Sequence, residues 1–297
     1  MVRKVIVAET RAQLRAALGG TPSTPDGIRG AGTLVATLGA LHRGHAALFE
    51  LAASRPGLRV ASIFVNPTQF GPGEDFARYP RQLAADLDLC RAHGIDVVFA
   101  PAVKQMYPEG DDRVTVDPGP LGGILEGAHR PGHFRGVLTV VAKLFGLVAP
   151  RAAIFGEKDY QQLALVSAMV DSLCLPIDVV AAETVRDGDG LALSSRNRYL
   201  TPPERESSLV LHQALEAGRA AGGKGAAAVL AAAERTLQTR PGVRVDYLSL
   251  LAPDLSQLRS SGPARLLVAA SIGSTRLIDN VAVSVQEPLS TPGAGGD

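Results

Sequence analysis

The chain has 297 residues, of which 46% are hydrophobic, 20% are charged and 4% are aromatic. This size and balance predict an ordinary soluble globular protein with room for two domains and a sizeable core. The formal net charge of +1 gives no general attraction to nucleic acid, so any anion recognition must be local. No apolar run approaches the roughly 18 residues of a membrane span, and the first ten residues lack a signal-peptide core. A cytoplasmic protein that does not act at a membrane is therefore expected.

The first third of the sequence contains one long loop and one of the two cysteines. Val2–Val7 predicts a short strand, and Thr10 is a suitable cap for a helix that runs to Leu18. Gly19–Gly32 is rich in glycine, proline and small polar residues, which predicts a mobile surface loop. Cys90 and the later Cys174 lie in apolar helical patterns, so both are expected to be small buried side chains rather than a disulfide or reactive thiols.

The stretch Thr33–Leu51, TLVATLGALHRGHAALFEL, carries the strongest local signal. Its first six residues form an apolar run typical of a strand, Gly39 breaks the run, and the following apolar residues recur with helical spacing. This pattern places His42 and His45 at a helix N-terminus, where unpaired N–H groups and the helix dipole favour an anion. The stretch therefore suggests phosphate binding.

Two other interpretations of the histidine pair remain open at this point. The two side chains could simply be polar surface residues. A metal site would need a third and a fourth ligand, and the neighbouring sequence marks none. The phosphate interpretation becomes stronger only because later stretches agree with it.

After residue 33, predicted strands alternate with predicted helices. This alternation is typical of the α/β class, here a Rossmann-like doubly wound parallel sheet, in which ligands bind beyond the carboxyl ends of the strands. The strands are expected at Arg59–Val65, Ile95–Phe99, Ala152–Phe155 and Ile177–Ala181, with a short piece at Val114–Val116, and the helices at Leu83–His93, Gly136–Val148 and Gln161–Cys174.

Polar residues collect where several of these strands end. Asn66 and Gln69 follow one strand, although Asn-Pro alone is a common turn signal. Lys158 follows another strand, just before Gln162 at the start of a helix, and Ser194–Asn197 form a loop of hydroxyl, amide and guanidinium donors. Such donors can bind a triphosphate, although a plain capping loop would also explain Ser194–Asn197.

The loop Glu126–Gly136, EGAHRPGHFRG, is rich in basic and titratable groups. Surface solvation would explain one or two of them, whereas an anionic partner would explain the whole group, which consists of His129, Arg130, His133 and Arg135.

The composition changes beyond about Thr184. Two helices, Pro202–Ala221 and Ala226–Leu237, precede three strands, which are expected at Val243–Leu250, Arg265–Ala270 and Arg276–Val285. We therefore expect an N-terminal domain at residues 1–183 and a smaller C-terminal α+β domain at residues 184–297, which acts as a lid and ends in a disordered tail.

Five motifs, in order, resemble the pantoate–β-alanine ligase family: GALHRGH, SIFVNPTQFGPGEDFARYPR, RPGHFRGVLTVVAKLF, FGEKDYQQL and DGLALSSRNRYL. The resemblance covers essentially residues 33–285. It also makes His42–His45 a version of the HIGH motif of the class I aminoacyl-tRNA synthetase-like nucleotidyltransferases, with Ser194–Arg196 in the place of their KMSKS loop.

The resemblance implies that ATP, with Mg²⁺, adenylates pantoate, and that β-alanine then displaces AMP, in a cytoplasmic homodimer without a nucleic-acid partner. The implied catalytic residues are His42, His45, Lys158, Ser194, Ser195 and Arg196, with His45 as the expected acid donor. The implied ATP-binding residues are Leu38, Gly39, Ala40, Leu41, His42, Arg43, Gly44, His45, Gly156, Glu157, Lys158, Asp159, Val185, Leu193, Ser194, Ser195 and Arg196. Gln69, Gln162 and Asn66 are the implied residues for pantoate and β-alanine, and Asp86 is the implied contact with Mg²⁺.

The sequence departs from the family pattern just before the histidine motif. Ala36 and Leu38 stand where the family usually has proline and methionine, which puts the fit of pantoate in more question than activity. Two further classes agree less well with the sequence. A plain nucleotidyltransferase would not explain the paired amides Asn66 and Gln69, and an RNA-binding module is disfavoured by the low net charge and few aromatic residues.

Overall fold

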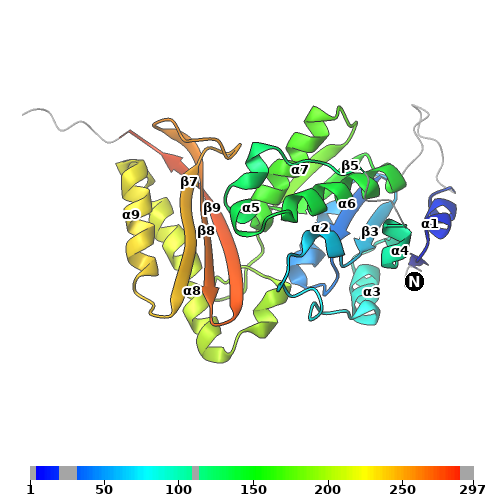
Figure 1. Ribbon diagram of the computed structural model, residues 1–297, viewed down its shortest axis with the longest axis horizontal. Coiled ribbons are helices and arrows are strands. Elements are labelled where there is room, and N and C mark those ends of the chain that lie inside the picture. Colours follow the sequence, from blue (N-terminus) through cyan, green and yellow to red (C-terminus); the bar gives the residue numbers. More distant parts are fainter. Residues whose placement is uncertain (1–4, 20–31, 109–113, 288–297) are drawn as a thin grey trace, which may run out of the picture. The chain divides into compact units, whose positions relative to one another are not determined.

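The computed structural model describes residues 5–19, 32–108 and 114–287, and the chain divides into two compact units (Figure 1). The first unit comprises Met1–Val185 and Leu193–Ser195, and the second comprises Arg186–Ala192 and Arg196–Asp297. The chain therefore passes between the units three times around residues 186–195. The composition predicts a single boundary after residue 183, whereas residues 186–192 belong to the second unit and residues 193–195 to the first.

The first unit contains a six-stranded parallel sheet with the order β1-β4-β3-β2-β5-β6. Its central strands are short apolar runs that are buried on both faces, as expected for a parallel sheet covered on both sides. The strands are β1 Ile6–Ala8, β2 Thr33–Thr37, β3 Arg59–Ile63, β4 Val97–Phe99, β5 Ala152–Gly156 and β6 Asp178–Ala182.

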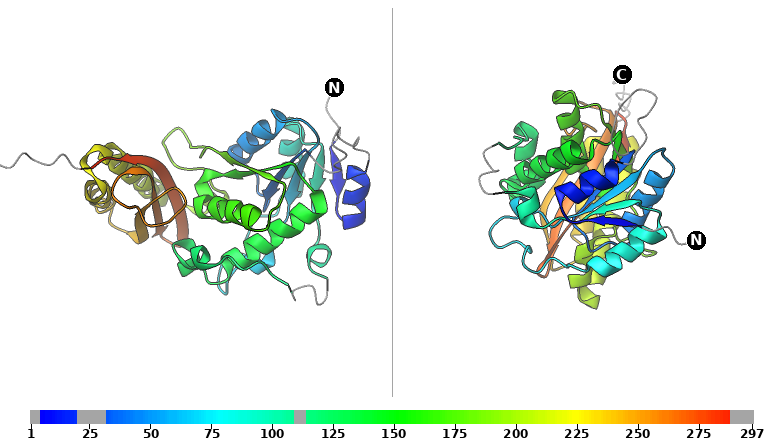
Figure 2. Two further views of the ribbon diagram at one scale, coloured as in Figure 1. Left: turned by 90° about the horizontal axis from the view of Figure 1, so that it is seen from above. Right: turned by 90° about the vertical axis from the view of Figure 1, so that its right-hand side faces the viewer.

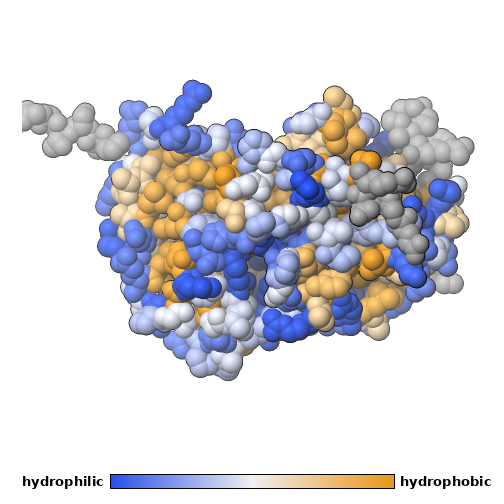
Figure 3. All heavy atoms as spheres, viewed as in Figure 1, coloured by the Kyte–Doolittle hydropathy of each residue, from blue (hydrophilic) through white to orange (hydrophobic). Residues whose placement is uncertain are grey.

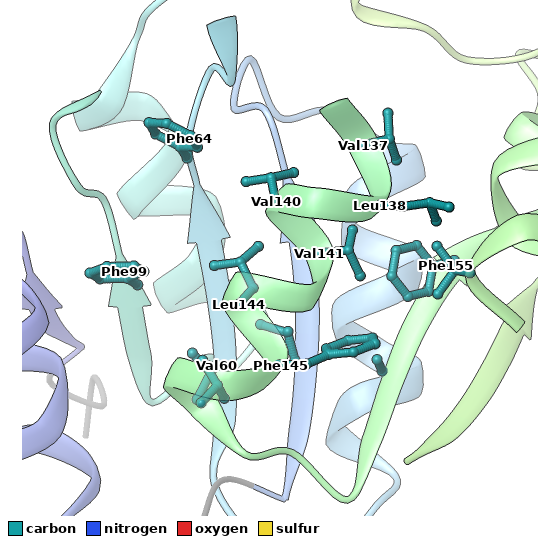
Figure 4. Close-up of a cluster of buried hydrophobic side chains, with 14 of the residues drawn as sticks. Val60, Phe64, Phe99, Val137, Leu138, Val140, Val141, Leu144, Phe145 and Phe155 are labelled. Carbon is teal, nitrogen blue, oxygen red and sulfur yellow. The ribbon is translucent and has the colours of Figure 1, made fainter. Parts of the chain in front are cut away.

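Helices cover both faces of this sheet (Figure 2). One face packs against α1 (Arg11–Leu18), α6 (His133–Val148) and α7 (Tyr160–Ser172), and the other against α2 (Arg43–Ala53) and α3 (Leu83–Ala92). Figure 4 shows side chains of α6 directed onto those of the sheet. Shorter helical segments are α4 Val103–Met106, α5 Glu126–His129, η1 Pro67–Gln69, η2 Pro120–Gly123 and η3 Glu157–Asp159.

The second unit is a three-stranded antiparallel sheet, β7-β8-β9, with two helices packed on it. Apolar side chains gather over its strands in the space-filling view (Figure 3). Residues 186–192 belong to this unit because Arg186 pairs with Asp279 at 2.6 Å and Arg205 pairs with Asp187 at 2.9 Å. The elements are η4 Ser195–Tyr199, α8 Pro202–Ala220, η5 Gly222–Lys224, α9 Ala226–Leu237, β7 Val243–Leu251, β8 Gly262–Ile272 and β9 Thr275–Val285.

The predicted fold class is confirmed, and most element boundaries differ by one to three residues. Three local predictions differ from the structure. Val114–Val116 is not a strand. Helix α6 begins at His133 rather than Gly136, because Gly132 adopts the left-handed conformation that ends the preceding loop. Cys174 is exposed beyond the end of α7, whereas Cys90 is buried as expected.

Some predictions lie outside the described residues. These are most of the loop Gly19–Gly32, the start of the strand Val2–Val7 and the tail after Glu287. Within the described ranges, no helix combines the length and the apolar character needed to cross a bilayer.

The strand order defines the position of a ligand site. The chain runs outward on one side of the sheet through β2, β3 and β4, and on the other side through β5 and β6. The order therefore reverses between β2 and β5, and the crevice beyond the carboxyl ends of two such strands is where α/β sheets bind ligands. The segments that follow β2, β3 and β5 all emerge at this end of the sheet.

Candidate active site

The turn between β2 and α2 begins the site. Gly39 has φ 84° and Ala40 has φ 51°, so two successive residues occupy the left-handed region. Glycine adopts this region readily, whereas for alanine it is unusual. The hydroxyl of Thr37 accepts the N–H of Gly39 at 3.2 Å, which helps to fix the reversal. Leu38, just before the turn, is partly exposed, and Arg43, after it, is exposed.

His42 and His45 cap the helix that follows. Nδ1 of His42 accepts the N–H of Gly44 at 3.1 Å, and Nδ1 of His45 accepts the N–H of His42 at 3.2 Å. The ring centroids lie 4.2 Å apart. In a neutral imidazole that accepts through Nδ1, the proton is carried by Nε2. The two rings thus occupy some of the backbone donors that the sequence had assigned to phosphate.

The surroundings of His45 keep its ring neutral. Burial, followed by the charge of His42, lowers the pKa of His45 to about 3, with Lys158 lowering it further and Asp159 opposing the change. At neutral pH the ring is therefore a hydrogen-bond donor. The expected acid role would require a pKa nearer the working pH, and the negative charge of a bound triphosphate would raise the pKa in that direction.

Lys158 follows β5 in the short turn η3. Its Nζ lies 3.5 Å from Oδ1 of Asp159, and its side chain is 20% exposed. Because β5 is paired with β2, Lys158 leaves the sheet beside the histidine turn, which agrees with its electrostatic effect on His45. Gly156 and Glu157 belong to the same segment, and a Cβ atom at Gly156 would have nothing within 4 Å. This segment therefore supplies a cation beside the neutral ring of His45.

The end of β3 carries a buried amide pair. Asn66 is fully buried, and its Nδ2 donates to Oε1 of Gln69 at 3.0 Å and to the carbonyl of Gly136 at 3.2 Å. Its Oδ1 accepts the N–H of Thr68 at 3.3 Å and the hydroxyl of Tyr107 at 2.8 Å. Every hydrogen-bonding atom of the Asn66 side chain is thus used inside the protein.

Residues of the basic loop before α6 form hydrogen bonds with the segment that carries the amide pair. Nδ1 of His133 lies 2.8 Å from the carbonyl of Gln69, Nε2 lies 3.0 Å from Nη1 of Arg130, and Arg130 is paired with Glu74 at 2.6 Å. Burial, followed by the charge of Arg130, lowers the pKa of His133 to about 4, so Nδ1–H donates to Gln69 and Nε2 accepts from Arg130.

The interpretation of this loop as an anion site is therefore wrong for Arg130 and His133, whose partners lie within the protein. Arg135 forms an exposed ion pair with Asp117, and His129 is exposed. The close packing of α6 on η1 also requires Gly136, because a Cβ atom there would lie 2.3 Å from the carbonyl of Thr68.

The neutral state of His133 predicts a pH dependence of stability. The folded pKa of His133 is about 4, below the ordinary 6.5. Between these pH values the histidine binds a proton in the unfolded chain but not in the folded chain. The free energy of unfolding should fall as pH drops below 6.5 and level off below pH 4, by up to about 3 kcal/mol from this group. Denaturant titrations at several pH values should show a shallower loss for His133→Asn. The exposed His129→Gln variant serves as the control and should keep the wild-type slope, and an unchanged slope in His133→Asn would contradict the assignment.

Two adjacent glutamines at the start of α7 differ in their surroundings. Gln161 is buried, accepts the N–H of Glu126 at 2.9 Å, and donates to the carbonyls of Leu121 and Ile124, each at 2.8 Å. The side chain of Gln162 is partly exposed and forms no hydrogen bond within the described part of the chain. Gln162, which the family resemblance selected, is therefore the one available to a ligand.

Residues 193–195 return to the first unit after the excursion into the second. The N–H of Leu193 donates to the carbonyl of Val185 at 2.9 Å, and the hydroxyl of Ser195 donates to the carbonyl of Ala40 at 3.1 Å. The hydroxyl of Ser195 thus joins the serine motif to the histidine turn by a hydrogen bond, and Ser194 precedes it in the chain. Arg196 belongs to the second unit.

Asp86 lies beneath the histidine turn, and it does not have the surroundings of a magnesium ligand. Its side chain is 1% exposed, and both carboxylate oxygens accept backbone N–H groups. Among the residues that the structure describes, no group of three or more histidine, cysteine, aspartate and glutamate side chains could hold a metal ion.

The first unit therefore gathers, at one end of its sheet, two imidazoles, a lysine and amides. The pantoate–β-alanine ligase family model matches residues 7–282 of this sequence. The chain belongs to the pantoate–β-alanine ligase family. It is 52% identical to a pantothenate synthetase of Nocardioides sp., with 98% of this chain and 88% of that protein aligned.

Solved structures agree with this assignment to the ligase family. Pantothenate synthetase from Thermus thermophilus has a TM-score of 0.87 at 48% identity and aligns over 93% of this chain and 99% of that chain. The pantoate–β-alanine ligase from Francisella tularensis, complexed with β-γ ATP and β-alanine, has a TM-score of 0.77 at 32% identity and aligns over 94% of this chain and 97% of that chain. The histidine turn, amide pair and Lys158 thus lie in a ligase of this family.

Proposed function

We propose that this chain condenses pantoate with β-alanine at the expense of ATP, through a pantoyl-adenylate. Membership of the family and the Francisella complex with an ATP-type ligand and β-alanine support the overall reaction. The arrangement at the switch point supports the adenylate route, because the proposed phosphate-binding groups follow β2 and β5, and the amide pair follows β3, the strand next to β2.

In the first step, a carboxylate oxygen of pantoate attacks the α-phosphorus of ATP, and the bond to pyrophosphate breaks. In the second, the amine of β-alanine attacks the acyl carbon, the bond to AMP breaks, and the nitrogen loses a proton. A free carboxylate is a poor electrophile, and the mixed anhydride supplies a leaving group. The protein needs to provide charge neutralisation and positioning rather than a covalent nucleophile.

The proposed ATP site extends from Leu38 to His45 and includes Gly156–Asp159, Val185 and Leu193–Arg196. His42 and His45 would donate Nε2–H bonds to phosphate oxygens, and Lys158 would neutralise the charge that develops as pyrophosphate leaves. Magnesium would enter with ATP as part of the substrate, since the described residues offer no metal cluster and Asp86 is fully engaged.

The proposed pantoate site is formed by Gln69 and Gln162, with Asn66 behind Gln69. Because Oε1 of Gln69 accepts from Asn66, the amide NH₂ of Gln69 is left to donate to an oxygen of the substrate. A nucleotidyltransferase acting on a second nucleotide would have no evident use for this amide pair. We further propose that the enzyme works in the cytoplasm as a homodimer, as expected for the family.

The decisive experiment measures exchange of labelled pyrophosphate into ATP without β-alanine. An adenylate mechanism predicts exchange that depends on pantoate, followed by stoichiometric AMP and pantothenate when β-alanine is added. A plain nucleotidyltransferase would exchange only with a nucleotide partner. Formation of ADP and inorganic phosphate would instead indicate an acyl phosphate and would overturn the adenylate step, even if pantothenate were made.

The two glutamines of α7 provide a matched test of the pantoate site. Gln162→Ala should raise the KM for pantoate about tenfold, the effect of one lost hydrogen bond of about 1.4 kcal/mol, with little change in thermal stability. Gln161→Ala should instead lower the melting temperature, since three backbone groups lose their hydrogen-bond partner. Steady-state kinetics and thermal melting of both variants check this. A raised KM for pantoate in Gln161→Ala, with a lowered melting temperature in Gln162→Ala, would mean that Gln161 binds pantoate and Gln162 supports the fold.

A further inference from the structure

Asp86 is bonded to the turn that precedes the histidine motif. Located in the first turn of α3, it accepts the N–H of Ala40 through Oδ2 at 3.0 Å and the N–H of Leu41 through Oδ1 at 2.8 Å. Nε2 of Gln82 lies 3.5 Å from Oδ1. The two carboxylate oxygens thus bind successive backbone donors, which fixes the orientation of that part of the turn.

The geometry of the turn explains why such a partner is needed. Ala40 has φ 51°, a conformation that alanine holds only when its surroundings impose it. Asp86 holds the N–H of Ala40, and the hydroxyl of Ser195 holds the carbonyl of the same residue at 3.1 Å. Space is also limited, because a Cβ atom at Gly39 would lie 3.0 Å from Oδ2 of Asp86. Ala40 is therefore held from both sides by residues distant in sequence.

We infer that Asp86 is a positioning residue for the nucleotide site, which holds the backbone of residues 39–41 in the shape that presents the two histidines, and is not a magnesium ligand. This inference rests on the proposed function of that turn in binding ATP. In this role the Asp86 carboxylate holds two backbone N–H groups through charge-assisted hydrogen bonds, which are stronger than neutral ones.

The surroundings of Asp86 are those of a buried hydrogen-bond acceptor. Magnesium in proteins keeps several water ligands and needs an open octahedral shell, whereas the side chain of Asp86 is 1% exposed. One turn along α3, burial and then the negative charge of Asp86 raise the pKa of Cys90 to about 12, so this thiol is not an ionised ligand.

Asp86→Asn is the sharpest test because it preserves shape. An amide can accept only one of the two N–H groups with its oxygen, and its NH₂ would oppose the other. We expect the KM for ATP in the pantoate-dependent exchange to rise about ten- to a hundredfold, as for loss of a hydrogen bond to a charged group. The KM for pantoate should stay within about twofold, and the magnesium concentration for half-maximal rate at fixed ATP should not change.

Asp88→Asn is the matched control. Asp88 lies on the same helix, is exposed, and pairs with Arg91. This variant should behave as wild type in all three titrations. Wild-type exchange in the same assay tests the proposed function separately, since its absence would count against the ligase mechanism and not against the role of Asp86.

Two results would overturn the inference. An unchanged KM for ATP in Asp86→Asn would show that the turn keeps its shape without the carboxylate. A raised magnesium requirement with full recovery at high magnesium would make Asp86 a metal contact. If Asp86→Asn shows no cooperative melting transition, Asp86→Ser, which keeps one oxygen acceptor, is assayed instead, and the same two results decide.

Discussion

Replacing Lys158 by alanine is expected to lower the rate of pantoate-dependent pyrophosphate exchange by about two to three orders of magnitude, or about 3 to 4 kcal/mol, as for loss of one preorganised transition-state donor. Lys158 leaves β5 at the switch point and acts electrostatically on His45 across the site. In the adenylation step, negative charge grows on the oxygen that links the departing pyrophosphate. A fixed cation stabilises that charge more than it stabilises bound ATP.

The effect should therefore fall on turnover and much less on substrate binding. Stopped-time exchange assays at saturating ATP and pantoate measure turnover, and the KM values report binding. Lys104→Ala removes a lysine that is exposed on α4, and it should leave both parameters unchanged. If Lys158→Ala turns over at the wild-type rate, the lysine does not stabilise the transition state.

Much of the fold could be predicted because its signals are local. Short buried strands, glycine breaks and helix caps lie within a few residues of each other, and Thr10 caps α1 as the sequence indicated. The start of α6 was missed because it depends on the left-handed conformation of Gly132 in a loop rich in polar residues. Cys174 was misplaced because an apolar pattern continues past the last residue of α7.

The sequence predicts which strand ends carry the residues of the candidate site, but not the hydrogen bonds that connect those residues. The histidine motif predicted the start of α2 but not that its two rings cap this helix. The partners that hold the turn and the amides are distant in sequence. Asp86 is 46 residues from Ala40, His133 is 64 residues from Gln69, and Tyr107 is 41 residues from Asn66. No spacing rule connects such pairs, because the sheet order brings them together. This is why the charged loop before α6 suggested an external anion although its arginine and histidine have internal partners.

The orientation of the Asn66 amide follows from backbone groups. Its oxygen faces the N–H of Thr68, which can only donate, and its nitrogen faces the carbonyl of Gly136, which can only accept. The remaining N–H of Asn66 must then donate to Oε1 of Gln69. Since Asn66 is fully buried, we expect it to act on substrate only through Gln69.

Asn66→Asp should invert this arrangement with little change in shape. A carboxylate in place of the amide would repel both Oε1 of Gln69 and the carbonyl of Gly136, so Gln69 would turn its NH₂ inward and present its oxygen to pantoate. An oxygen facing an acidic substrate is repulsive. We expect kcat/KM for pantoate to fall about a hundredfold or more, or about 3 kcal/mol, with a smaller change in the KM for ATP.

A double-variant cycle distinguishes this role from a general loss of structure. If Asn66 acts through Gln69, the pair Asn66→Asp with Gln69→Ala should be no worse for pantoate than Gln69→Ala alone, because the amide to be oriented is already absent. Tyr107→Phe is the mild control. It removes one donor to Asn66 but leaves the N–H of Thr68 in place, so a change of no more than about threefold is expected. Additive losses in the double variant, with melting temperatures lowered in parallel, would instead mean that Asn66 supports the fold of this loop, and that the amide of Gln69 is oriented by the substrate itself.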